Sequence, residues 1–142
     1  MNHLTSQQLA KDFRDLRVFQ LAMDSAMEIF ALTKKFPVEE RYSLSDQIRR
    51  SSRSVCANIA EAWRKRRYPA AFVSKLSDAD AEAAETSVWI EFAHRSQYID
   101  EDRKGALLDK YDHICRQLSK MMTEPEAWIL LPSTSRSTTR NL

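Results

Sequence analysis

The stretch Arg41–Arg67, RYSLSDQIRRSSRSVCANIAEAWRKRR, decides the fold because its residues separate into two helical faces. At about 100° per residue, one face is apolar and contains Leu44, Ile48, Val55, Ile59 and Ala62. Another face carries a band of arginines with only the small Ala57 and Ala60 between them. The stretch therefore predicts an amphipathic helix whose basic band lies off the apolar core.

The charge of this stretch is balanced elsewhere in the chain. It holds eight Lys/Arg residues and two acids, whereas the 142-residue chain has a net charge of only +2. Residues 72–102 hold eight acids and two basic residues, which gives that segment a net charge of −6. The chain is thus electrostatically polarised, one helix against another.

The basic band is the first candidate site. It is dominated by arginine and has almost no acids one helical turn away, whereas ordinary solvent faces mix Lys with Glu. Two interpretations stay open: the band binds nucleic-acid phosphates, or it pairs with Asp78, Glu82 and Glu85 of the same or another subunit. The candidate nucleic-acid-binding residues are Arg49, Arg50, Arg53, Arg64, Lys65, Arg66 and Arg67.

Composition predicts an all-α single domain. One glycine and four prolines are too few for the turns of a β protein, and good helix formers dominate. No apolar run approaches the roughly 18 residues of a membrane span. The N-terminal sequence lacks the apolar core of a signal peptide. We therefore expect a cytoplasmic protein in which Cys56 and Cys115 are reduced.

Four helices are expected, at about 15–35, 43–65, 69–97 and 101–122. Asp15 and Asp100 are candidate N-caps, Ser43 with Asp46 resembles a capping box, and Pro69 fits a first helical turn. Short connections favour an antiparallel up-down-up-down four-helix bundle over residues 14–131. Small residues then permit close approach of the second and third helices, namely Ser51, Ser52, Ala79 and Ala83. Residues 1–13 are expected to be frayed, 127–131 to fold back over the bundle, and 132–142 to form a disordered Ser/Thr-rich tail.

The third helix is apolar on two sides in its second half. Val88, Trp89 and Phe92 lie opposite the stripe that faces the bundle, in line with the acids. A helix that is apolar all round is buried on both sides, so these three residues predict a subunit interface.

No set of catalytic or cofactor-binding residues is present. The chain has no phosphate-binding glycine loop, dinucleotide fingerprint, nucleophile elbow or zinc-binding helix motif. His113 and Cys115 point about 200° apart on a helix, and no Glu-x-x-His pair accompanies the acids of the third helix. We expect no enzyme activity, no metal and no cofactor.

Several runs resemble one known family. They are DLRVFQLAM (15–23), LTKKFPVEERYSLSDQIRRS (32–51), NIAEAW (58–63), EAAETSVWIEFA (82–93) and YDHICRQLSKMM (111–122). Over residues 15–131 the chain resembles the four-helix-bundle family, also called the 23S ribosomal RNA intervening-sequence protein family. The resemblance implies a homopentameric ring of four-helix bundles.

A relative in that family suggests partners. The accessory variability determinant protein of diversity-generating retroelements is a basic pentamer that binds nucleic acid and partners a reverse transcriptase. The resemblance thus implies RNA or DNA, and a reverse transcriptase, as partners. The chain carries Ala62 and Gln97 where members commonly carry glycine, and we expect both residues to lie in helices that run on.

Overall fold

The computed structural model describes residues 10–130, which form four long helices and three short 3₁₀ turns. The long helices are α1 (Arg17–Thr33), α2 (Leu44–Arg64), α3 (Pro69–Arg95) and α4 (Glu101–Thr123), and the 3₁₀ turns are η1 (Phe13–Asp15), η2 (Val38–Glu40) and η3 (Pro125–Ala127). The predicted frayed end up to residue 9 and the predicted tail 132–142 lie outside the described residues.

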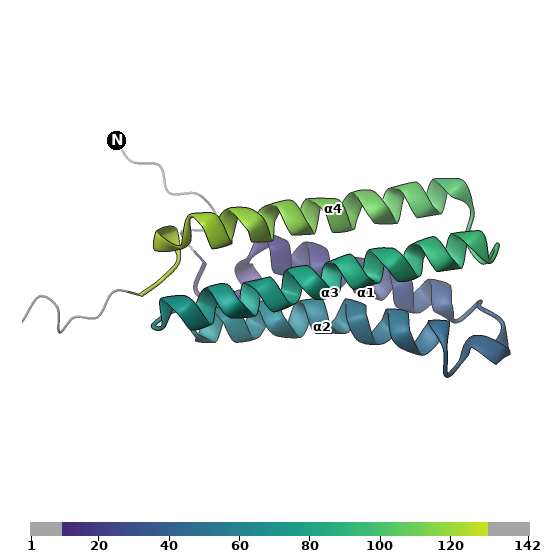
Figure 1. The fold of residues 1–142 in the computed structure, drawn as a ribbon, viewed down its shortest axis with the longest axis horizontal. Helices are drawn as coiled ribbons and strands as arrows, with labels where there is room; N and C mark the ends of the chain where they lie inside the picture. Colours follow the sequence, from purple (N-terminus) through teal and green to yellow (C-terminus); the bar gives the residue numbers. More distant parts are fainter. Residues whose placement is uncertain (1–9, 131–142) are drawn as a thin grey trace, which may run out of the picture.

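The four long helices lie side by side along one axis (Figure 1). Helices α1 and α3 run in one direction and α2 and α4 in the other, with contacts α1–α2, α2–α3, α3–α4 and α1–α4. No strand occurs between residues 10 and 130. The prediction of an all-α four-helix bundle is confirmed, whereas its assembly into a pentameric ring stays a prediction.

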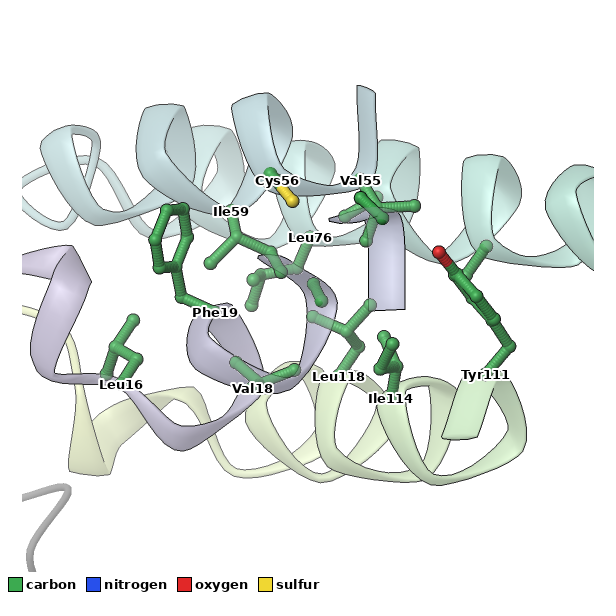
Figure 2. Packing of buried hydrophobic residues seen from close by; sticks show 14 of the residues in the cluster. Leu16, Val18, Phe19, Val55, Cys56, Ile59, Leu76, Tyr111, Ile114 and Leu118 are labelled. Atoms are coloured by element: carbon green, nitrogen blue, oxygen red, sulfur yellow. The ribbon is translucent and has the colours of Figure 1, made fainter. Parts of the chain in front are cut away.

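The core lies along the bundle axis, where apolar side chains of all four helices meet (Figure 2). Val55 and Ile59 of α2 are at most 1% exposed, as are Leu76 of α3 and Leu118 of α4. Fully burying one such side chain stabilises the fold by roughly 1.5–3 kcal/mol relative to exposure. The apolar face predicted for residues 41–67 is therefore one of the faces that hold the bundle together.

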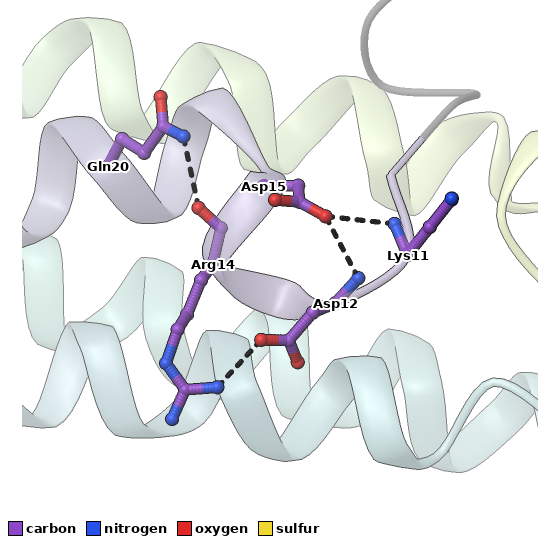
Figure 3. Close-up of polar contacts among 5 residues, drawn as sticks. All are labelled: Lys11, Asp12, Arg14, Asp15 and Gln20. Carbon is purple, nitrogen blue, oxygen red and sulfur yellow. Dashed lines mark hydrogen bonds and ion pairs between the residues drawn. The ribbon is translucent and has the colours of Figure 1, made fainter.

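The segment before α1 is ordered from residue 10, although residues 10–13 were expected to be frayed. Ala10 and Phe13 pack against the core. The Asp15 carboxylate accepts hydrogen bonds from the backbone N–H groups of Lys11 and Asp12, at 3.0 and 3.2 Å (Figure 3). Asp15 therefore closes the short turn η1 and does not cap α1, which begins at Arg17 with Leu16 as its N-cap.

The start of α2 also differs from the prediction. Ser43 is the N-cap residue, but its φ and ψ of −124° and −106° lie outside the extended region, and its side chain makes no capping hydrogen bond. Glu40 takes this role, because its Oε1 accepts the backbone N–H of Leu44 at 3.2 Å. Asp46, the other half of the predicted capping box, instead lies 4.0 Å from Arg50.

The later helix boundaries agree better with the sequence. Pro69 occupies the first turn of α3, and the Asp100 carboxylate accepts the backbone N–H of Arg103 at 2.8 Å at the start of α4. The prediction that α3 continues to residue 97 is wrong, because it ends at Arg95 and Gln97 has a φ of +66°. The backbone N–H of Tyr98 bonds the carbonyl of Ala93 at 2.9 Å, which closes a left-handed cap of the Schellman type.

The chain after α4 folds back over the bundle, as expected for residues 127–130. Trp128 and Ile129 pack against the core, and the backbone N–H of Leu130 donates to the carbonyl of Arg66 at 2.9 Å. This contact ties the end of the described chain to the α2–α3 connection.

Candidate nucleic-acid interface

Three cations gather around the ring of Phe30 on α1. Lys34 Nζ lies 4.6 Å from the ring centroid, and the guanidinium carbons of Arg49 and Arg53 lie at 4.9 and 5.7 Å. A ring face attracts cations, by about 0.5–1 kcal/mol each at exposed sites, and so offsets part of their mutual repulsion. These four residues, called the Phe30 cluster below, join α1 to the basic band of α2.

Within the cluster, Arg49 is held in place and Arg53 is free to contact solvent. Arg49 Nε donates to Thr33 Oγ1 at 2.7 Å, and the same hydroxyl donates to the carbonyl of Phe30 at 2.9 Å. Arg53 is exposed, and between residues 10 and 130 neither arginine forms an ion pair. The cluster therefore carries positive charge that the described part of the chain does not neutralise.

The basic band continues toward the end of α2. Ala57 and Ala60 have small side chains that do not cover this side of α2. Arg64 follows on the same side, where it is exposed and forms no ion pair in the described chain. At about 1.5 Å per residue, Arg49 and Arg64 are about 22 Å apart along the axis. We call Lys34, Arg49, Arg53 and Arg64 the basic face.

Four predicted binding residues lie outside this face, and two of them, Arg50 and Arg66, have other partners. Arg50 lies on the α3 side of α2, beside Asp46 and at a hollow shared with Glu82 and Glu85. Arg66 stacks on the Trp63 ring at 3.4 Å and donates from Nε to the Trp63 carbonyl at 2.9 Å. Its guanidinium is partly buried, which lowers the pKa of Arg66, so this residue supports the helix end. Lys65 and Arg67 are exposed in the connection that follows.

The acids of α3 do not pair with the basic face within one chain. Asp78 lies 3.9 Å from Lys75 of its own helix, and Lys75 also forms an ion pair with Glu61 of α2 at 2.8 Å. Burial raises the pKa of Glu82, and the nearby charges of Glu85 and Asp78 raise it further, against a smaller opposing effect of Arg50. The acids are thus crowded together and only partly neutralised by the described cations.

The predicted interface residues lie together on α3. Val88 and Phe92 are 49% and 54% exposed, and the rings of Phe92 and Trp89 are 5.7 Å apart. Trp89 also packs against the core, and its Nε1 is buried without a hydrogen-bond partner in the described chain. Tyr42, 86% exposed, joins Trp89 and Phe92 at a hollow of about 430 Å³. We call Tyr42, Val88, Trp89 and Phe92 the aromatic face.

Sequence reasoning missed Lys34 and Tyr42 as members of these surfaces. Lys34 follows Phe30 by one helical turn, which is a legible signal for a cation beside a ring. Tyr42 lies in the connection before α2, where helical periodicity gives no signal, and only the packed structure brings it to α3.

His94, Cys56 and Cys115 each have an environment that limits their reactivity. No group of three or more His, Cys, Asp or Glu side chains between residues 10 and 130 could hold a metal ion. His94 Nε2 lies 3.0 Å from the Glu101 carboxylate, and burial raises the pKa of Cys56 to about 11 and that of Cys115 to about 12. No helix of the described chain is long and apolar enough to cross a membrane.

Comparison with known proteins gives a family match over most of the chain. Residues 14–120 match the family described as 23S rRNA-intervening sequence protein. A crystal structure from Bacteroides thetaiotaomicron, of a protein with unknown function from the S23 ribosomal protein family, superposes with a TM-score of 0.68 at 31% identity. The match covers 75% of this chain and 95% of that one. A comparison with curated proteins found no match.

Proposed function

Because the chain belongs to the family of 23S rRNA-intervening sequence proteins, we propose that it is a non-enzymatic bundle that binds the phosphate backbone of RNA or DNA. The Phe30 cluster carries this proposal, since three cations share one ring and the described chain gives them no ion-pair partner. A polyanion relieves the repulsion among such cations, so a phosphate backbone is the ligand that suits them. The family description refers to 23S rRNA, which makes RNA the first nucleic acid to test.

The proposal includes self-association through the aromatic face. No residue of the basic face lines the aromatic hollow, so copies can join there while each basic face stays accessible. The homopentameric ring implied by the resemblance is the assembly we propose. A reverse transcriptase is the protein partner to test, in a cytoplasmic setting.

Binding to the backbone predicts a steep salt dependence. Each neutralised phosphate contributes about −0.9 to the slope of log K against log salt for duplex DNA and about −0.7 for a single strand. Sequence preference is expected to be weak, because phosphate contacts position a protein without reading bases. Gel-shift titrations with RNA and DNA over a salt series measure both properties.

A double charge reversal locates the binding surface. Arg53→Glu with Arg64→Glu should abolish gel-shift binding at low salt, and the circular dichroism spectrum should stay helical because both side chains are exposed. Arg95→Glu with Arg116→Glu is the matched control, since it makes the same charge change at exposed positions of α3 and α4. A double variant at Arg53 and Arg64 that binds like the wild type contradicts the proposed surface.

The crowded acids of α3 favour a second candidate function. The arginines of α2 would then meet Asp78, Glu82 or Glu85 of another copy, and the protein would be an interaction scaffold without nucleic acid. In that case Arg53→Glu with Arg64→Glu reduces the mass measured by light scattering, and reversing Glu82 and Glu85 to lysine restores it. A double variant that keeps its mass and loses RNA supports nucleic-acid binding.

A further inference from the structure

A second basic site lies at the connection between α1 and α2, where Lys34, Arg41 and Arg49 line an open hollow of about 240 Å³. Lys34 directly follows α1, Arg41 directly follows η2, and Arg49 lies in the second turn of α2. No carboxylate lines this hollow. It shares Lys34 and Arg49 with the basic face, whereas Arg41 belongs to the hollow alone.

The hollow forms where the chain leaves α1, which ends at Thr33, four residues before Pro37. Phe36 and Pro37 stop the helix, and η2 then turns the chain back toward α2, so that Phe36, Pro37 and Val38 form an apolar wall. The wall is fixed from outside, because the Phe36 ring lies 5.2 Å from the ring of Tyr98.

The carboxylate nearest in sequence to Arg41 is held elsewhere. Glu40 Oε2 accepts the Tyr98 hydroxyl at 2.7 Å and its Oε1 accepts the backbone N–H of Leu44 at 3.2 Å. These hydrogen bonds hold the pKa of Glu40 below its usual range, so the carboxylate stays ionised. Its hydrogen-bond partners lie outside the lining of the hollow.

One donor in the hollow, the Arg49 guanidinium, is also pre-oriented. Arg49 donates from Nε to Thr33 Oγ1 at 2.7 Å, and its side chain makes no other hydrogen bond between residues 10 and 130. Its two terminal nitrogens form the planar fork that binds phosphate oxygens in pairs. The side chain of Arg41 is exposed, and the buried Ser45 adds a hydroxyl to the lining.

From this geometry we infer that the hollow binds a single phosphate monoester group. The volume lies below the roughly 300–1,000 Å³ of pockets that enclose a whole drug-sized ligand, so one tetrahedral group suits it. Three cations match a monoester, which carries about −1.5 to −2 charges near pH 7, better than a singly charged carboxylate or backbone phosphodiester. The group can come from the phosphorylated end of a nucleic-acid strand or from a small phosphorylated molecule.

Inorganic phosphate tests the site without any nucleic acid. Titrated into the full chain at constant ionic strength with chloride as the reference anion, phosphate should raise the melting temperature in a saturable way. Arg41→Ala should weaken phosphate binding by about tenfold, because a hydrogen bond to a charged group contributes on that order. Lys35→Ala is the control, since this exposed neighbour of Lys34 does not line the hollow. Absent saturation, or equal loss in Lys35→Ala and Arg41→Ala, overturns the inference.

A second arm identifies the source of the phosphate. RNA with a 5′-phosphate is compared with the same RNA carrying a 5′-hydroxyl, in the wild type and in Arg41→Ala. A preference for the phosphorylated strand that disappears in Arg41→Ala assigns the site to strand ends. Equal binding of both strands, with phosphate binding still dependent on Arg41, assigns it to a small ligand. If RNA does not bind at all, the proposed function fails, whereas Arg41-dependent phosphate binding still supports the site.

Discussion

Gln97 is a single residue at which backbone conformation and side chain disagree. Its φ of +66° is the one positive value at a non-glycine position between residues 10 and 130. The left-handed region brings Cβ close to the following carbonyl and costs about 1–2 kcal/mol for most residues. Glycine has no Cβ and therefore fits the left-handed cap after α3 without this cost.

Replacing Gln97 with glycine should therefore stabilise the protein. Relief of the strain, reduced by the greater chain entropy that glycine loses, leaves a gain of about 0.5–1 kcal/mol in the free energy of unfolding. Urea denaturation measures it as a higher midpoint. Ser96→Gly is the control, because φ is −82° at Ser96 and glycine should give no gain there. An unchanged midpoint for Gln97→Gly would show that the surroundings have already absorbed the strain.

Glu28 provides a pH-dependent contribution to stability. Burial raises its pKa, but hydrogen bonds and charges from Lys110 at 2.6 Å and Arg103 at 3.2 Å outweigh this and hold it below the usual value. A carboxyl with a lowered pKa in the folded state stabilises the fold above the pKa of the unfolded chain, near 4.5 here, and this contribution is lost as the pH falls below that value.

Glu28→Gln should then destabilise the protein by up to about 1 kcal/mol at pH 7, a value that allows for solvent screening of partly exposed partners. The difference from the wild type should shrink steadily as urea unfolding is repeated from pH 5 to pH 3. Asp24→Asn removes the same charge from an exposed position of α1 and should show no such trend. A Glu28→Gln deficit that stays constant with pH would refute the electrostatic explanation.

At the scale of the elements, α2 and α3 can approach closely because the side chains between them are small. Ser51, Ser52, Ala79 and Ala83 are all at most 3% exposed, as the sequence predicted for a close contact. The Thr86 hydroxyl lies 2.8 Å from the Ser51 hydroxyl and links the two helices inside the core. The close contact leaves no room for a larger side chain.

Ala79→Leu should destabilise the bundle by about 1–3 kcal/mol, because a larger residue must force the helices apart or adopt a strained rotamer. Ala81→Leu makes the same change two residues away at an exposed position and should stay within about 0.5 kcal/mol. Chemical denaturation of both variants gives the comparison. Equal midpoints would mean that α2 and α3 separate at little cost.

The sequence predicted a helix boundary well where the residues that fix the boundary lie next to it in the chain. Asp100 and Pro69 act within their own helices, so local spacing was sufficient. The start of α2 depends on Glu40, which is itself held by Tyr98 from beyond α3, and no local pattern contains that contact. Arg50 lies at the hollow that Glu82 and Glu85 of α3 line, and this placement also depends on a contact between helices. Arg66 stacks on Trp63 three residues earlier, a local contact that a count of charges does not indicate. Phe30 could be assigned to the core stripe of α1, but its position among cations required the packing of α1 on α2.

For the molecule as a whole, the aromatic face predicts self-association. Burial of a large apolar side chain contributes roughly 1.5–3 kcal/mol, which copies of the chain can gain by covering this face. Phe92→Glu should reduce the mass measured by light scattering to that of a monomer and keep the helical circular dichroism spectrum. Phe92 suits this test better than Trp89, which also packs against the core.

Met27→Glu is the matched control for Phe92→Glu, since Met27 is exposed to a similar extent, 56% against 54%, but lies on α1. Its mass should equal that of the wild type. A wild-type chain that is monomeric at micromolar concentration would end the proposal of a ring.

The separation of the aromatic and basic faces has a consequence for binding strength. If aromatic contacts join copies, every added copy brings another basic face to the same nucleic acid, and later contacts form at a high effective concentration. Avidity would then exceed the affinity of one chain by about 10²–10⁴ when the geometry allows simultaneous contact. Binding would rise cooperatively with protein concentration around the assembly threshold, so Phe92→Glu would weaken RNA binding more than Met27→Glu, which introduces the same negative charge.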